Sequence, residues 1–377
     1  MTRITLIDAD VVRLPYDEIV GFVGEVFRIL GIPDKRAATS AEALCYGELT
    51  GMTTHGLVNL TRIYLRLFES GRIDPHAEPL ITSDAGAAVH LDAGRALGLW
   101  MAAEAMDLAA ERAEQFGIGM VSVRNSTHVG CTGFHASRAV ERQMIGLVLS
   151  NCGRQRIARP PGGKLAMLGT NPLALAAPAG SQHPFVLDMS TTVVPTGRIR
   201  AAARGCERIP VGWLEDDRGN PVTDAAAFDR GEARLRWLGG DPATGAYKGY
   251  GLGLLVEVLG ALLPGAGLGP EPDSMKGDGN PSGRDDDIGF LALAIDPGKL
   301  RPAAAFLADA DTLFRTLCAC PPADGVTGVR YPGWHEAERA AANRRFGVAV
   351  PLWLCEELRH VGDDLGLEFS ISMGGPA

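Results

Sequence analysis

The feature that most constrains this sequence is a change of pattern along the chain. Residues 16–71 carry apolar side chains at helical spacing, for example Ile19 and Val23. From about residue 75, short apolar runs typical of strands alternate with helical segments, and beyond residue 300 only the helical pattern returns. Strands alternating with helices indicate an α/β core. We therefore expect an α/β fold in which the two helical chain ends pack together as one lobe.

The alternation can be followed run by run. Strands are expected at about 87–91, 119–123, 145–149, 173–177, 185–188 and 289–295. The clearest helix runs from about Leu97 to Phe116, with Gly117 just past its end. Further helices are expected at about 197–204, 248–263, 303–319, 335–345 and 351–360. Residues 264–287 are rich in Gly, Pro and Asp, and form a loop too long to be a passive connector.

Composition excludes several classes of protein. The formal net charge is −9 with both signs scattered, so no basic stripe suggests nucleic acid. The longest apolar run, around 252–263, is broken by Glu257 and is too short to span a membrane. The N-terminus lacks a secretory signal, and the seven cysteines are spread without a CxxC pair. We expect a cytoplasmic protein with reduced thiols and no metal site.

The common signatures of catalysis and nucleotide binding are missing. No G-x-G-x-x-G follows a strand, and there is no G-x-x-x-x-G-K-[ST]. Neither G-x-S-x-G nor H-E-x-x-H occurs. The sequence therefore does not fit a Rossmann dinucleotide fold, a P-loop enzyme, an α/β-hydrolase or a zinc protease.

Two histidines lie at turns between regular elements. His128 lies in Asn125–Gly130, between a strand-like run and a helix, where an imidazole can face a ligand. His55 lies in Thr53-Thr54-His55-Gly56 at a helix break, where the Thr54 hydroxyl can orient the ring or relay a proton. The alternative in both cases is a histidine that caps a neighbouring carbonyl.

Three further polar positions follow apolar runs. Thr170, in the turn Gly169–Pro172, can bind a carboxylate or carbonyl, or simply cap the turn. Asp188 closes the run Phe185–Leu187, at a strand end where ligand sites of α/β proteins concentrate, and can equally cap a helix. Lys248 opens a helix, which suits a phosphate, and can equally be a solvated lysine.

The order of the motifs is more specific than any one of them. They are Thr54-His55-Gly56, Asn125–Gly130, Pro161-Gly162-Gly163, Gly169–Leu173, Asp188–Thr191, Pro221–Asp224 and Lys248–Leu252. Together, from about residue 13 to about 360, they resemble the malate/L-lactate dehydrogenase-like oxidoreductases. That family includes malate, sulfolactate and ureidoglycolate dehydrogenases, diketogulonate reductase, and reductases of cyclic imines such as piperideine-2-carboxylate.

The resemblance implies an architecture. The family's nicotinamide-binding fold is not of the Rossmann type, and its members are usually homodimers. The implied division is a discontinuous helical domain (1–74 and 300–377) and an α/β cofactor-binding region (75–299), which contains a smaller third domain at about 125–190.

The resemblance also implies roles for individual residues. His55 matches the family's proton donor, Thr54 the hydroxyl that assists it, and His128 a histidine given a proton-acceptor role in some members. Thr170 matches a substrate-binding threonine. The implied contacts to NAD or NADP are His128, Gly130, Cys131, Thr132, Asp188, Met189, Ser190, Lys248, Gly249, Pro332 and Gly333.

The chain departs from the family pattern at the substrate carboxylate. Four residues after the catalytic histidine the family usually has an arginine, and here the residue is Asn59. An amide can bond a carboxylate but lacks the charge-assisted fork of arginine. Arg62, one turn further, is a candidate replacement, as are Arg154 and Arg156 in a nearby loop.

Two other departures bear on substrate and cofactor. Arg198 stands where the imine reductases carry an aspartate, which favours a hydroxy-acid substrate. Trp334 replaces the usual glutamate after Pro332-Gly333, so the chain also departs from the family pattern beside an expected cofactor contact.

The sequence thus predicts an NAD(P)-dependent oxidoreductase that moves a hydride between nicotinamide and C2 of a 2-oxo/2-hydroxy acid. The alternatives are a reductase of a cyclic imine carboxylate and a non-catalytic, nucleotide-binding relative. The expected partner is a small-molecule substrate.

Overall fold

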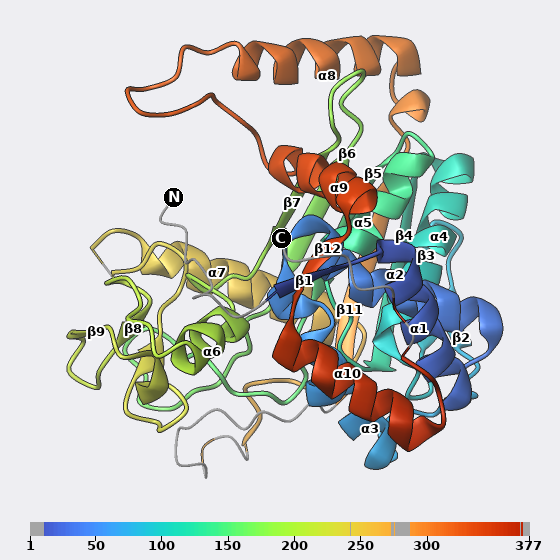
Figure 1. The fold of residues 1–377 in the computed structure, drawn as a ribbon. Helices are drawn as coiled ribbons and strands as arrows, with labels where there is room; N and C mark the ends of the chain where they lie inside the picture. Colours follow the sequence, from blue (N-terminus) through green and yellow to red (C-terminus); the bar gives the residue numbers. More distant parts are fainter. Residues whose placement is uncertain (1–10, 242, 273–274, 276–286, 370, 372–377) are drawn as a thin grey trace.

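The computed structural model describes residues 11–241, 243–272, 275, 287–369 and 371. A seven-stranded sheet runs through the molecule in the order β2-β3-β4-β11-β5-β6-β7 (Figure 1). Its strands are β2 (Leu80–Asp84), β3 (Ala88–Asp92), β4 (Ile118–Ser126), β5 (Ile145–Ser150), β6 (Leu173–Ala177), β7 (Phe185–Met189) and β11 (Ile288–Ile295). Only β3 and β4 pair in parallel. The expected α/β class is confirmed, with a mixed sheet.

Strand β11 comes last of these strands in the sequence but lies between β4 and β5. Successive side chains of a strand point to opposite faces of the sheet. Phe290 and Ala292 join a core with helix α4 (Gly98–Phe116), whereas Leu291 packs on the other face with Val256 of α7 (Ala246–Glu257). Burial on both faces explains why this strand is an uninterrupted apolar run.

Glycine allows two helices to approach the sheet closely. A Cβ at Gly119 of β4 would lie 1.9 Å from the Ala109 carbonyl oxygen of α4. A Cβ at Gly146 of β5 would lie 2.2 Å from the Ala136 carbonyl oxygen of α5 (Thr132–Glu141). Helices α4 and α5 therefore press directly on β4 and β5, and this fixes the turn that joins β4 to α5.

The two chain ends lie side by side. The N-terminal strand β1 (Val11–Leu14) pairs antiparallel with β12 (Val348–Pro351) near the C-terminus. The helices at these ends are α1 (Tyr16–Ile29), α2 (Asp34–Thr50), α9 (Trp334–Phe346) and α10 (Leu352–Leu365). Asn343 of α9 donates its side-chain amide to the carbonyl oxygens of Glu48 (3.1 Å) and Leu49 (2.9 Å). These carbonyls lie in the last turn of α2, where the Glu48 carbonyl oxygen also accepts from the Gly51 N–H at 3.3 Å, so α9 contributes to capping the helix that leads to His55.

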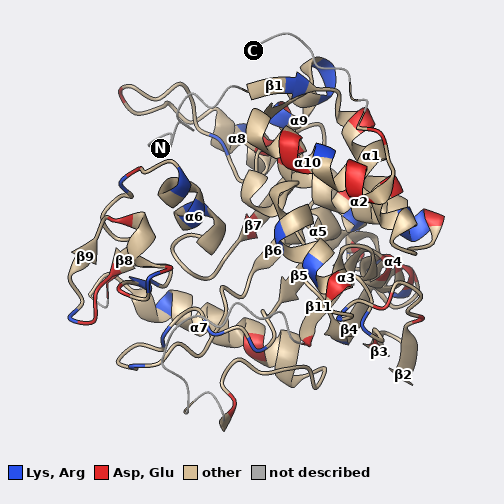
Figure 2. Ribbon diagram, turned by 60° about the horizontal axis from the view of Figure 1, so that its bottom comes forward, with Lys and Arg blue, Asp and Glu red and all other residues tan. Residues whose placement is uncertain are grey.

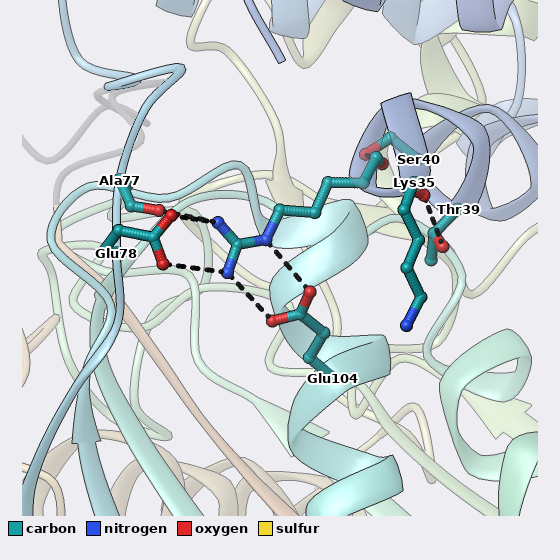
Figure 3. A network of polar contacts seen from close by, with 7 residues as sticks. Lys35, Thr39, Ser40, Ala77, Glu78 and Glu104 are labelled. Carbon is teal, nitrogen blue, oxygen red and sulfur yellow. Dashed lines mark hydrogen bonds and ion pairs between the residues drawn. The ribbon is translucent and has the colours of Figure 1, made fainter. Parts of the chain in front are cut away.

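Helix α2 is also tied to the sheet layer. Arg36 donates to the Glu104 carboxylate of α4 at 3.0 Å and to the Ala77 carbonyl oxygen at 3.0 Å, and Figure 3 shows this network. Its guanidinium lies 3.9 Å from the ring centroid of the buried Trp100. Part-buried arginine with several acceptors holds the first helices in one place relative to α4.

A separate small lobe lies beside the sheet (Figure 1, left). It contains α6 (Thr196–Arg204), η3 (Ala225–Ala227) and a three-stranded sheet of β8 (Leu214–Glu215), β9 (Pro221–Val222) and β10 (Arg234–Leu235). Its own core includes Ile199, Phe228 and Leu235. Residues 125–190, the segment expected to contain a smaller third domain, supply β5, β6 and β7 to the central sheet, and the three-stranded sheet lies at 214–235, within the expected cofactor-binding region (75–299).

The remaining segments complete the fold. Helix α8 (Ala303–Cys318) projects from the body and packs on the β6–β7 hairpin through Ala179, Phe314 and Tyr331 (Figure 1). Of the expected loop at 264–287, residues 273–274 and 276–286 lie outside the described residues. Among the described residues no helix is long and apolar enough to cross a membrane.

The central position of β11 gives a test of the fold. Replacing the fully buried Phe290 by alanine should lower the free energy of unfolding by about 3–5 kcal/mol, because it leaves a cavity at the middle of the sheet. Leu80→Ala, on the exposed edge strand β2, should change it by less than about 0.5 kcal/mol. Urea unfolding of both variants checks this. Equal losses would show that β11 does not form the core described above.

Candidate active site

Two histidines far apart in the sequence meet face to face. His55 ends the short helix η1 (Thr53–His55), and His128 follows β4. Their ring centroids are 6.1 Å apart and their planes are inclined by 11°. Both side chains are mostly buried. The structure therefore brings together the two imidazoles that the sequence singled out separately.

The His55 turn is pressed against the end of α2. A Cβ at Gly47 would lie 2.7 Å from the Gly56 Cα, and a Cβ at Gly56 would lie 1.9 Å from Glu48 Oε2. The backbone N–H of Leu57 donates to Glu48 Oε2 at 2.8 Å. Two glycines and a buried carboxyl group thus determine how closely the His55 turn packs against the end of α2.

Glu48 is a site residue that the sequence reading missed. It is only 6 % exposed, and burial raises its pKa to about 8. The carboxyl group is therefore largely protonated at neutral pH in the folded protein. No motif marks it, because its neighbours are apolar helix residues and its role depends on the turn that folds back over it.

Asn59 and Thr54 hold the His55 ring. Thr54 Oγ1 lies 3.1 Å from His55 Nδ1. One amide hydrogen of Asn59 is donated to the Thr54 carbonyl oxygen at 3.1 Å, and Asn59 is 7 % exposed. One amide hydrogen of Asn59 is thus used within the His55 turn, and the expected contact between Asn59 and a substrate carboxylate stays a prediction.

His128 is held in one tautomer. The Gly130 N–H donates to His128 Nδ1 (3.2 Å), and the Tyr64 hydroxyl lies 2.8 Å from the same atom. A backbone N–H can only donate, so Nδ1 is the unprotonated nitrogen and Nε2 carries the hydrogen. Burial, followed by the charges of His55 and His135, lowers the pKa of His128 to about 3. His128 is therefore a neutral hydrogen-bond donor at physiological pH.

Tyr64 comes from the π-helical segment η2 (Leu60–Tyr64) and is fully buried. The sequence placed it only on an apolar helix face. Its hydroxyl is the polar end of a core side chain, and such a hydroxyl usually finds a partner. His135, in turn, donates from Nε2 to the Val129 carbonyl oxygen at 2.7 Å, which fixes the backbone after His128.

Asp188 lies at the end of β7 and caps helix α5. Its carboxylate accepts from Thr132 Oγ1 (2.6 Å) and from the Gly133 N–H (2.7 Å). Burial raises the pKa of Asp188, and these two hydrogen bonds oppose the rise. Burial lowers the pKa of His55, and the negative charge of Asp188 opposes that change. The carboxylate therefore acts on His55 electrostatically without an ion pair.

Other predicted site residues gather near the end of β7. The Thr170 carbonyl oxygen accepts from both the N–H and the hydroxyl of Thr191, each at 3.0 Å. Ser190, next to Met189, donates its hydroxyl to the Thr192 carbonyl oxygen at 3.2 Å. The Pro332 carbonyl oxygen accepts from the Val186 N–H at 3.1 Å.

Two of these positions are closely packed. Gly333 (φ 92°) has room only for hydrogen, because a Cβ would lie 2.6 Å from the Val186 nitrogen. Cys131 is buried between β4 and α5, and burial together with the charges of Asp188 and Glu48 raises its pKa.

Comparison with known proteins identifies this arrangement. The sequence model of the malate/L-lactate dehydrogenase family matches residues 14–359. The chain belongs to the malate/L-lactate dehydrogenase family. Membership confirms the expectation of an NAD(P)-dependent oxidoreductase, and relatives named for NAD+ and for NADP+ both occur.

Individual relatives cover most of the chain. It is 38 % identical to a malate dehydrogenase of Pyrococcus abyssi over 69 % of this chain and 70 % of the relative. It is 32 % identical to an L-sulfolactate dehydrogenase of Methanocaldococcus jannaschii over 91 % and 94 % of the two chains. The crystal structure of malate dehydrogenase from Entamoeba histolytica superposes with a TM-score of 0.88 at 28 % identity, covering 96 % of this chain and 99 % of that one.

Lys248 and Gly249, expected cofactor contacts in this family, lie at the start of α7. A Cβ at Gly249 would lie 2.4 Å from the Leu238 nitrogen, so the start of α7 packs tightly against the backbone at Leu238. Lys248 is exposed and, among the described residues, has no carboxylate partner. The N–H groups of Ala246, Lys248 and Gly249 already donate to backbone carbonyl oxygens, so the charge of the Lys248 ammonium group is the feature here that suits a phosphate group.

The three candidate replacements for the family arginine lie in two places. Arg154 is exposed and forms an ion pair with Glu271 at 3.2 Å, and Arg156 is partly buried in the same loop. That loop begins beside Thr170, whose Oγ1 is 3.6 Å from Cys152 Sγ. Arg62 lies on η2, directly after the His55 turn, with its guanidinium carbon 5.7 Å from the Trp353 ring.

Glu48 gives a test of how the turn is held. In Glu48→Gln the side-chain oxygen can still accept from Leu57. In wild type, the Glu48 carboxyl group keeps its proton in the folded state between pH 5 and 8, whereas in the unfolded chain, where its pKa is about 4.3, it has lost that proton. The free energy of unfolding of wild type should therefore fall by more than about 1 kcal/mol between pH 5 and 8. Glu48→Gln should lack most of this fall, and Glu42→Gln, on the exposed side of α2, should keep it. Urea unfolding at several pH values distinguishes them. A parallel decline in wild type and Glu48→Gln would mean that Glu48 is not buried as a neutral acid.

Proposed function

We propose that this protein interconverts a 2-hydroxy acid and the matching 2-oxo acid, with NAD or NADP as hydride carrier. The observation that carries the proposal is the parallel pair His55 and His128, 6.1 Å apart, with Asp188 acting on one of them. The printed activities of the relatives, malate and sulfolactate dehydrogenation, support this substrate class.

The residues present fit a dinucleotide. Lys248 at the start of α7 has no carboxylate partner among the described residues and suits a pyrophosphate. Gly130, Thr132 and Asp188 line the turn beside the two imidazoles. When bound, the nicotinamide ring supplies or accepts the hydride.

His55 is the group that moves the proton. Its Nδ1 lies beside the Thr54 hydroxyl, which can accept a hydrogen from Nδ1 and leave Nε2 to exchange a proton with the substrate oxygen. In the oxidation direction the neutral ring removes the hydroxyl proton. In the reduction direction the protonated ring delivers it to the developing alkoxide.

His128 binds and orients rather than exchanging protons. Its Nδ1 accepts from Gly130, so only the Nε2–H can point to the substrate. With a pKa of about 3, the ring stays neutral and donates a hydrogen bond to the substrate oxygen. We therefore assign His128 an electrophilic role instead of the proton-acceptor role implied by some relatives.

The expected architecture is part of the same proposal. Only one parallel pair in the seven-stranded sheet, and no glycine fingerprint, support a nicotinamide site outside the Rossmann class. The β1–β12 pair and the cap from α9 onto α2 support a helical lobe made from both ends (1–74 and 300–377). All seven cysteines are free thiols, which supports the cytoplasm.

A homodimer is also part of the proposal. The face of α7 and η4 (Val258–Leu262) away from the sheet exposes large apolar side chains, namely Tyr247 (65 %), Leu255 (44 %), Val258 (49 %) and Leu262 (61 %). A contiguous apolar helix face of this kind marks a protein interface.

An assay panel separates this function from its alternatives. Malate, lactate and sulfolactate are tested with NAD+ and NADP+, and piperideine-2-carboxylate with NADH and NADPH. Turnover of hydroxy acids supports the proposal. Turnover of the imine alone supports the cyclic-imine alternative, and tight cofactor binding without any turnover supports a non-catalytic relative.

The proton-transfer role of His55 is tested by His55→Gln. Turnover should fall about 10²–10⁴-fold, because the developing charge on the substrate oxygen loses its proton partner. Cofactor binding, measured by fluorescence titration, should change little. His76→Gln replaces an exposed histidine and should behave as wild type. Near-normal turnover in His55→Gln would remove His55 from the mechanism.

The electrostatic role of Asp188 is tested by pH dependence. Oxidation needs neutral His55, so kcat/KM should fall only as the pH drops below about 6.5, the ordinary histidine value, because burial lowers the His55 pKa. In Asp188→Asn the negative charge that opposes this lowering is gone, so the acid limb should move to still lower pH. The profile is recorded at saturating cofactor. A shift toward higher pH would contradict the assignment.

A further inference from the structure

The only acidic residue of helix α7 lies inside the protein. Glu257 interrupts the longest apolar run of the sequence and is the last residue of this helix. It is only 5 % exposed. In Figure 2 the helix is largely tan, because Lys248 and Glu257 are its two charged residues. Burying a carboxyl group costs free energy unless it is hydrogen-bonded, so Glu257 requires partners inside the fold.

The carboxyl group of Glu257 is surrounded by hydrogen-bond donors. Its Oε2 accepts from the Asn171 side-chain amide at 2.9 Å, and its Oε1 accepts from the Gly269 N–H at 2.8 Å. The Asn151 side-chain amide also donates to Oε1, at 3.5 Å. Burial raises the pKa of Glu257, and these hydrogen bonds oppose the rise. Because each of these partners donates, the group binds them as an ionised carboxylate.

The backbone fixes the orientation of both asparagine amides. The Asn171 amide also donates to the Gly253 carbonyl oxygen at 3.0 Å. The Asn151 amide donates to the Gly267 carbonyl oxygen at 2.8 Å, and its Oδ1 accepts from the Gly289 N–H at 3.0 Å. A carbonyl oxygen can only accept and a backbone N–H can only donate, so neither amide can be turned over. The fold therefore determines which hydrogens face the carboxylate.

The two asparagines enclose Thr170, the residue predicted to bind the substrate. Asn171 follows it directly and has a left-handed backbone, with φ 39°. Cys152, next to Asn151, packs on the other side, with its Sγ 3.6 Å from Thr170 Oγ1. A Cβ at Gly169 would lie 2.3 Å from the Cys152 Cβ and 3.0 Å from Asn171 Oδ1, so the turn is tightly packed on both sides. One carboxylate thus holds the segments on both sides of Thr170.

The register of the central sheet places this turn at the same edge as the two imidazoles. Residues at this edge of successive strands are Ser126, Ile288, Ser150, Leu173 and Met189. His128 comes shortly after the first of them, and Thr170 comes shortly before Leu173. Beyond Met189 the pairing continues, because the N–H and the hydroxyl of Thr191 both donate to the Thr170 carbonyl oxygen at 3.0 Å. The Thr170 turn therefore belongs to the edge that carries the candidate active site.

We propose that Glu257 is a positioning residue, whose carboxylate acts through Asn171 and Asn151 to hold the Thr170 hydroxyl where it receives the substrate. This rests on the proposed function and adds to it a residue that acts only through others. An amide in place of the carboxylate would direct N–H hydrogens at groups that are themselves donors. The Thr170 turn would then shift, because buried donors would lose their acceptor.

The kinetic test uses the hydroxy acid that wild type oxidises. Glu257→Gln should raise its KM about 10-fold, as expected for a weakened hydrogen bond to substrate, and lower kcat less than about 3-fold. Cofactor affinity, measured by fluorescence titration, should stay the same. A merely structural loss would lower the active fraction, and with it kcat, at unchanged KM. The control Glu111→Gln replaces an exposed carboxylate of α4 and should behave as wild type.

A double variant shows whether Glu257 acts through Thr170. Thr170→Val should also raise KM, and adding Glu257→Gln to it should change kcat/KM by less than about 2-fold, because the second change removes nothing further. Additive losses, or a fall in kcat at unchanged KM, would overturn the proposal. Absence of wild-type turnover on every hydroxy acid would contradict the proposed function instead.

Hydrogen exchange decides the proposal even without turnover. The Thr191 N–H, whose acceptor is the Thr170 carbonyl oxygen, should exchange about 10-fold or more faster in Glu257→Gln than in wild type, because the turn loosens locally. Exchange in strands β3 and β4 should not change. Exchange at Thr191 that equals wild type, or that rises together with the whole sheet, would overturn the positioning role.

Discussion

Two imidazoles that face each other below the surface cannot both carry a proton. His55 and His128 lie 6.1 Å apart in nearly parallel planes, and burial lowers the pKa of each. The fold breaks the symmetry between them. A backbone N–H at Nδ1 keeps His128 neutral, whereas His55 has a hydroxyl at Nδ1 and the negative charge of Asp188 nearby. This difference is the basis for our proposal that His55 exchanges protons and His128 donates a hydrogen bond.

This division depends on distant parts of the chain. The His55 turn is pressed on α2, whose last carbonyls are capped from α9 near the C-terminus. The His128 turn is held by the close packing of α4 and α5 on the sheet and by Asp188 at the end of β7. Strand β11, inserted between β4 and β5, completes the sheet that supports this second turn. The site is thus a meeting point of three segments, each fixed by its own packing.

Much of this could be predicted from the sequence, for identifiable reasons. Long periodic elements such as α4 and apolar runs such as β11 can be recognised in the sequence. Burial on one or two faces requires apolar residues at regular positions. The short strands β1 and β12 escaped notice, since four residues carry too little pattern. Tyr64 escaped notice because its partner His128 lies far away in the sequence, and Glu48 escaped notice because its partner Leu57 lies on a turn that folds back over the helix. The order of β5, β6 and β7 in the central sheet could not be predicted, because the pattern of a strand does not reveal which strands it pairs with.

The most direct measurement is a nitrogen NMR titration of the histidine side chains, with the two rings assigned through His55→Gln and His128→Gln. The account predicts that His128 remains neutral between pH 5 and 8, with its hydrogen on Nε2, as expected for a pKa of about 3. It also predicts that His55 takes up a proton only below its ordinary pKa of about 6.5. A His128 ring that is protonated near neutral pH, or that carries its hydrogen on Nδ1, would contradict the assignment of roles to the two histidines.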